Sequence, residues 1–133
     1  MNLIKIKLLG LVGISSLITM TAGASAQYTE KEIGLGIIDA YIPAGLKTNQ
    51  DAFLVVNGLF PNACYTFSSA EVIHIDDFTH QVKTLVKVRS GACARVMTPF
   101  NQQISLGDLK PGEHKIKMVS DDDTYFEKVM VIQ

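Results

Sequence analysis

The densest group of side chains able to do chemistry is the run from His74 to His80. On an extended strand His74 and Asp76 point to the same face, and His80 can fold back across a turn. Imidazole and carboxylate are ligands that zinc and copper accept, so one hypothesis is a metal site made by His74, Asp76 and His80. The alternative is a polar hairpin loop, because consecutive aspartates are common in turns.

Other clusters of functional side chains give weaker patterns. The run Asp121-Asp122-Asp123 carries hard oxygen ligands for calcium, but it lacks the alternating spacing and the closing glutamate of an EF-hand loop. No serine lies in a Gly-x-Ser-x-Gly turn, and no nucleophile, base and orienting group can be assigned. We therefore expect a non-enzymatic protein without a cofactor, with a small secreted hydrolase as the enzymatic alternative.

The elements that must position these side chains are short strands. In the run 82–89, Val82 and Val86 share one face while Lys83 and Lys87 lie on the other, a period of two that is typical of a half-buried strand. Similar runs are expected at 36–42, 52–60, 64–67, 72–75, 92–97, 104–109, 113–119 and 125–132. After residue 26, no run of residues has the apolar spacing of an amphipathic helix. The spacing predicts an all-β fold, a single antiparallel β-sandwich over 36–133, after a flexible lead-in or edge segment at 27–35.

The N-terminal segment has the three parts of a secretory signal peptide. Lys5 and Lys7 precede an apolar stretch, Leu8–Met20, and small residues lead to Ala26. We expect residues 1–26 to be removed. The apolar stretch is shorter than the roughly 20 residues that a spanning helix needs, so no membrane span is expected after cleavage.

The net charge of the chain and its expected export limit the classes of binding partner. The chain carries 12 basic and 13 acidic residues, and cleavage would remove Lys5 and Lys7, which leaves ten basic residues and a net charge of −3. A mildly acidic chain without a basic block is not expected to bind nucleic acid. The predicted location is the periplasm or the extracellular space, and the expected partner is another envelope or extracellular protein.

The chain has two cysteines, Cys64 and Cys93. In a small exported chain an even number of cysteines favours a disulfide, because an oxidising compartment preserves it. Neither a CxxC pair nor a neighbouring histidine supports the alternative of a reactive thiol or metal ligand. We therefore predict a Cys64–Cys93 bridge.

The run Leu109-Lys110-Pro111-Gly112, followed by His114, resembles the corner between two strands in fibronectin type III and related immunoglobulin-like domains. In those families a tyrosine after the Pro-Gly turn ties the turn to the backbone. The resemblance implies an immunoglobulin-like sandwich in which His114 replaces that tyrosine. Since His114 is in phase with Ile116 and Met118, we expect its ring to point inward as a structural group.

Aromatic residues beside prolines mark two expected strand ends, Phe60-Pro61 and Pro99-Phe100. Loop tips of this kind carry binding function in many sandwich domains, but the rings can also fold back and close the core. The run Phe60–Tyr65 also looks like the cysteine-bearing turn of small exported bacterial β-sandwich domains.

The function that the sequence favours is binding of a protein or peptide in the bacterial envelope, with inhibition of a protease as a special case. A periplasmic metal-binding domain that uses His74, Asp76 and His80 is the alternative.

Overall fold

A computed structural model describes residue 23 and residues 27–133. The expected signal peptide, residues 1–26, lies outside the described residues except for residue 23. Within the described part of the chain, no helix is both long enough and apolar enough to cross a membrane.

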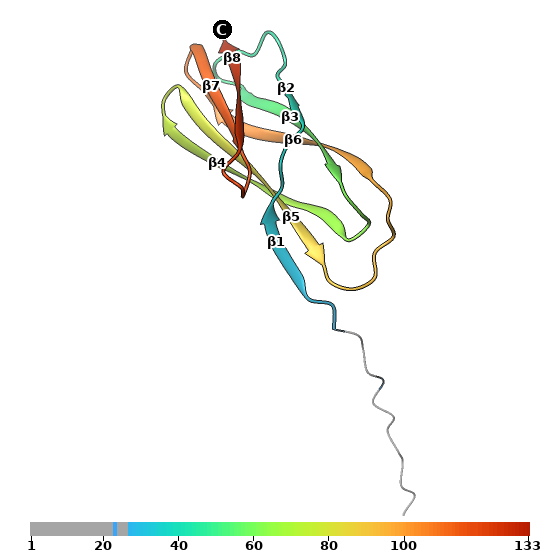
Figure 1. Ribbon diagram of the computed structural model, residues 1–133. Coiled ribbons are helices and arrows are strands. Elements are labelled where there is room, and N and C mark those ends of the chain that lie inside the picture. Colours follow the sequence, from blue (N-terminus) through green and yellow to red (C-terminus); the bar gives the residue numbers. More distant parts are fainter. Residues whose placement is uncertain (1–22, 24–26) are drawn as a thin grey trace, which may run out of the picture.

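The described residues form eight strands in two layers (Figure 1). The strands are β1 (Glu30–Gly34), β2 (Asp39–Tyr41), β3 (Asp51–Phe60), β4 (Tyr65–Asp76), β5 (Thr79–Arg89), β6 (Thr98–Asp108), β7 (Gly112–Val119) and β8 (Tyr125–Ile132). One sheet contains β1, β4, β5, β7 and β8, and the other has the order β2-β3-β6. The prediction of an all-β two-sheet sandwich is confirmed.

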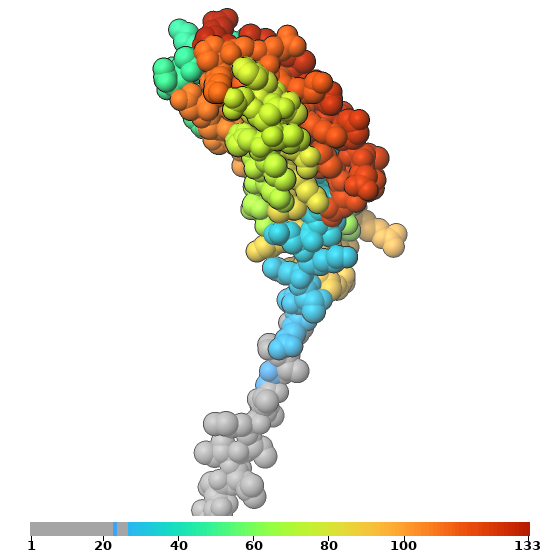
Figure 2. Space-filling view, turned by 90° about the vertical axis from the view of Figure 1, so that its left-hand side faces the viewer, coloured from blue at the N-terminus to red at the C-terminus, as the bar shows by residue number. Residues whose placement is uncertain are grey.

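Strand β5 organises the larger sheet. One edge of β5 pairs with β4 over 79–88, and the other edge pairs with β7 over 79–83 and with β1 over 85–89. Figure 2 shows the β4–β5 hairpin, in green to yellow, on the same face as the orange and red chain of β7 and β8. The β5–β7 pair is parallel, so this sheet is mixed rather than wholly antiparallel. Because β7 enters from the other sheet after β6, no hairpin constrains its direction.

Strands β4 and β6 and the segment 92–97 differ from what the sequence predicts. The runs 64–67 and 72–75 belong to one strand, β4, which is irregular near Ser68 and near Ile75. The run 92–97 contains no strand, and β6 begins at Thr98 and includes Pro99. Proline is tolerated there because β6 is the outer strand of its sheet and needs fewer N–H donors.

The core lies between the two sheets and follows the alternation of the strands. Leu54 and Val56 of β3 and Val82 and Val86 of β5 are fully buried. Thr84 lies between these valines and is also fully buried, and its hydroxyl has no hydrogen-bond partner among the described residues. Thr84 therefore places a hydroxyl group without a hydrogen-bond partner in the core.

The predicted disulfide is confirmed. Cys64, just before β4, is bonded to Cys93 in the strandless segment 90–97, and their Cα atoms are 5.4 Å apart. Ala63 N–H donates a hydrogen bond to the carbonyl of Ala94 beside the bridge. The disulfide therefore fixes the segment 90–97, which forms no strand, to the start of β4.

The substitution Cys64→Ala should lower the free energy of unfolding by about 2–4 kcal/mol, since the bridge restricts the unfolded chain, and should leave the β-sheet spectrum intact. Denaturant melts measure the loss. Alkylation of the native protein with and without reductant checks the premise, and two thiols that react without reductant would contradict it.

The substitution Thr84→Val should raise the free energy of unfolding by about 1 kcal/mol, because it removes a buried hydroxyl without a partner and keeps the side-chain shape. The matched control is Thr66→Val, on the exposed part of β4, where little change is expected. A destabilised Thr84→Val variant would show that the hydroxyl is satisfied in the folded protein.

Candidate functional site

All three histidines of the chain meet at the hairpin end of β4 and β5. His74 on β4 and His80 on β5 are paired across the hairpin, whose turn is Asp77-Phe78. His114 comes from β7, the parallel neighbour of β5. Lys115 N–H donates a hydrogen bond to the carbonyl of Phe78, which fixes the turn against β7.

The rings form one hydrogen-bonded chain, here called the histidine chain. His74 Nδ1 lies 2.7 Å from His80 Nδ1, and His80 Nε2 lies 2.8 Å from His114 Nδ1. His114 Nε2 lies 2.7 Å from the carbonyl oxygen of Lys110. His74 is exposed, whereas His80 is 1% and His114 0% exposed. The histidine chain therefore runs from the protein surface into the core between the sheets.

The direction of these hydrogen bonds follows from the Lys110 carbonyl, which can only accept. His114 Nε2 must donate to it, and a buried imidazolium without a carboxylate partner is costly, so Nδ1 of the neutral His114 ring accepts from His80 Nε2–H. By the same reasoning His80 Nδ1 accepts from His74 Nδ1–H. The only ring nitrogen outside the chain is then His74 Nε2.

The environment of His80 favours its neutral form. Burial lowers the pKa of His80 below its ordinary value, and the neighbouring rings of His74 and His114 lower it further, while Asp76 opposes the shift. A neutral His80 can accept at one nitrogen and donate at the other, as the histidine chain requires.

The structure does not bring the three expected metal ligands together as a set. His74 and His80 are in contact, but Asp76 follows the irregularity in β4 and its Oδ1 accepts the N–H of Phe78 at 2.8 Å. Asp76 is therefore part of the hairpin turn. Among the described residues, no group of three His, Cys, Asp or Glu side chains lies close enough together to hold a metal ion.

A hollow of about 170 Å³ lies against the exposed end of the histidine chain. Besides His74 and His80, the polar side chains around it are Asp76, Asp77, Asp108 and Lys110. Asp77 and Lys110 form an exposed ion pair, and Asp108 accepts the N–H of Asn49. The hollow is therefore acidic, with one lysine among its charges.

The corner residues lie directly behind the histidine chain. Leu109 is buried, and Gly112 has φ +133°, a conformation that favours glycine, with the ring of Phe78 against it. The hydrogen bond of His114 closes on Lys110, four residues earlier. Pro111 lies within this closed turn.

The aromatic residues considered for binding pack against one another. Phe60 is buried and stacks on Phe100, with ring centroids 4.3 Å apart. A Cβ on Gly58 would lie 2.2 Å from the Phe100 ring, so the ring occupies the space that a larger residue of β3 would fill. This geometry favours closure of the core over display by Phe60 and Phe100, while Pro61 and Pro99 stay exposed.

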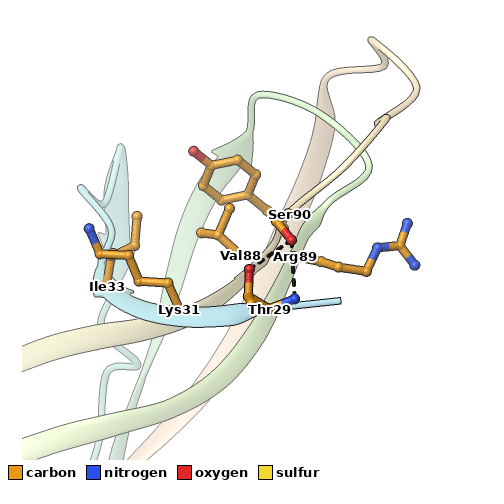
Figure 3. A pocket seen from close by; sticks show the side chains of 7 residues that line it. Thr29, Lys31, Ile33, Val88, Arg89 and Ser90 are labelled. Atoms are coloured by element: carbon orange, nitrogen blue, oxygen red, sulfur yellow. Dashed lines mark hydrogen bonds between the residues drawn. The ribbon is translucent and has the colours of Figure 1, made fainter. Parts of the chain in front are cut away.

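A wider hollow of about 390 Å³ lies where β1 joins the end of β5 (Figure 3). Thr29 and Ser90 are linked there by two hydrogen bonds, from the N–H and the hydroxyl of Thr29 to Ser90 Oγ, and Arg89 points away from them. Among the described residues, the charged side chains that line this hollow are those of Lys31 and Arg89, and no carboxylate or imidazole lies with them.

One exposed apolar region is not among the sites predicted from the sequence. Val129 and Val131 are 53% and 54% exposed on β8, beside a hollow of about 300 Å³ that is also lined by Ile42 and Pro43. The signal was present, because the run 125–132 has apolar residues in both phases of the alternation. The alternate residues Met130 and Ile132 are the ones buried in the core.

Residues 54–131 match the model of the family described as ORF11 beta-sandwich domain, which is more than half of the chain. The chain belongs to the ORF11 beta-sandwich domain family. No curated protein and no solved structure matches it. The part matched as an ORF11 beta-sandwich domain begins in β3 and ends in β8, and it includes the disulfide and the whole histidine chain.

In this ORF11 beta-sandwich domain, His114→Ala should lower the free energy of unfolding by more than about 1 kcal/mol. The change removes the bond to the Lys110 carbonyl, leaves His80 Nε2–H without an acceptor and opens a cavity. His74→Ala, at the exposed end of the same chain, is the matched control and should cost much less. Denaturant melts compare the two, and equal stabilities would contradict a structural role for His114.

Proposed function

We propose that this chain is an exported, non-enzymatic protein that binds an extended segment of another envelope or extracellular protein along the free edge of β8. The observation that carries the proposal is the outer edge of β8, which among the described residues is paired only at its C-terminal end, with exposed apolar side chains beside an apolar hollow. Strand addition to such an edge is a common mode of peptide recognition, in which main-chain bonds give affinity and side-chain pockets give specificity.

The free edge of β8 is open to strand pairing. β8 is the last strand of its sheet, and its far edge already pairs at the C-terminal end, where Gln133 N–H donates to Leu46 at 2.8 Å and Thr48 N–H donates to Gln133 at 2.9 Å. Backbone groups alternate between the two edges of a strand, so those of Val129 and Val131 face the same side as Gln133. A partner strand would extend the pairing that residues 46–48 begin.

The surroundings of this edge are apolar. Ile42 and Pro43 line the hollow next to Val129 and Val131 and offer a contact for alternate side chains of a bound strand. Lys128 of β8 pairs with Asp39 of β2 at 3.0 Å, an ion pair between the two sheets close to this edge. Contiguous exposed apolar surface of this kind is typical of interaction sites.

Export is supported by the disulfide, because such bonds persist in oxidising compartments, and by the leader pattern of residues 1–26. The periplasm or the extracellular space is therefore the proposed location.

A closer relation to fibronectin type III and immunoglobulin-like domains is also proposed. It is supported by the run Leu109–Gly112 and by the bond from His114 to the Lys110 carbonyl, which parallels the backbone bond of the tyrosine corner.

Site-specific photo-crosslinking in the producing cells tests the binding proposal. A photoreactive phenylalanine at Val129 should yield an adduct with a second protein, and the same group at Glu71, exposed on β4 at the other edge of the sheet, should not. Val131→Pro removes one N–H from the free edge and should reduce the adduct at least tenfold, whereas Val131→Thr keeps that N–H and should preserve it.

Three outcomes would contradict the proposal. They are equal adducts from positions 129 and 71, an adduct that survives Val131→Pro in a protein that still melts cooperatively, and an adduct made only with a second copy of this chain.

A further inference from the structure

We infer that His74 and His80 bind a divalent transition-metal ion, zinc or copper, at the hairpin end of β4 and β5. This site is separate from the edge of β8 and independent of strand binding there. Imidazole nitrogen is a ligand that both ions favour.

The spacing of the two rings fits a shared ion after a small movement. Their Nδ1 atoms lie 2.7 Å apart, whereas two nitrogens at about 2.0–2.1 Å from a tetrahedral ion are separated by roughly 3.3 Å. His74 is exposed and can rotate away from the pair, whereas His80 is buried and held in place. Rotation of the His74 side chain alone therefore provides the required change in the distance between the two Nδ1 atoms.

The proton balance of binding is simple. In the histidine chain His74 carries its proton on Nδ1 and donates it to His80 Nδ1. For both Nδ1 lone pairs to face an ion, the proton of neutral His74 moves to its free Nε2, by exchange with water at this exposed ring. Both rings stay neutral before and after, and no net proton is released from them.

The buried part of the histidine chain supplies the support that metal-binding histidines require. A ligating histidine usually donates its second N–H to a carbonyl, a carboxylate or another fixed acceptor, which orients the ring. His80 Nε2–H donates to His114, and His114 is held by the Lys110 carbonyl. Two histidines that meet by chance on a surface have no such support.

The remaining positions of the ion face the hollow of about 170 Å³. Asp76 is held in the hairpin turn and Asp77 is paired with Lys110, so we assign these positions to water. The nearby carboxylates add a negative field that favours a cation without ligating it.

Titration calorimetry of the purified protein with zinc chloride and with copper chloride tests the inference. We expect one ion per chain and at least a tenfold weaker affinity for His74→Ala, which removes one ligand from an exposed position. The control Asp77→Asn alters the same turn without removing a ligand and should change the affinity less than threefold. The variant His114→Gln should still fold and should bind the ion 10- to 100-fold more weakly, because it alters the group that orients the His80 ring.

Electron paramagnetic resonance with copper gives a second readout. The chain has only three histidines, and both cysteines are in the disulfide, so two imidazole nitrogens on copper can come only from the histidine chain. No binding by the wild type, less than a tenfold loss in His74→Ala, or a copper spectrum without imidazole nitrogen would each overturn the inference.

Discussion

The hydrogen bond from His114 to the carbonyl of Lys110 is the interaction on which the arrangement of the hairpin end of β4 and β5 depends. A carbonyl oxygen can only accept, so it fixes which nitrogen of His114 carries a proton, and through that ring it fixes His80 and His74 in turn. The same bond closes the turn before β7. One backbone acceptor therefore sets the turn, the orientation of the buried rings and the nitrogen of His74 that carries the proton in the absence of metal.

Much of the fold was predictable because its causes are local. The alternation in 82–89 defines a strand wherever that strand lies, and a chain with two cysteines allows only one internal bridge. The phase shared with Ile116 placed His114 on the inward face of its strand. The parallel pairing of β5 with β7 was not predictable, because it depends on how the chain crosses between the sheets, and sequence spacing does not encode that crossing.

The site was predictable only in part for the same reason. His74 and His80 are six residues apart across a hairpin, so local reasoning brings them together. His114 is 34 residues beyond His80 and joins them only through the register of β5 with β7. Asp76 was expected as a ligand, but its carboxylate accepts the backbone N–H of Phe78 in the hairpin turn. The two surfaces proposed to bind, the hairpin end and the edge of β8, are both left accessible by one rigid sandwich.

The direction of hydrogen bonding in the histidine chain is the central claim, and long-range ¹H–¹⁵N correlation spectra of the imidazole rings test it most directly. At neutral pH, without added metal, we expect His80 and His114 to carry their protons on Nε2 and His74, when neutral, to carry its proton on Nδ1. A proton on Nδ1 of either buried ring, or an imidazolium at His114, would contradict the account, because the Lys110 carbonyl would then no longer determine the chain.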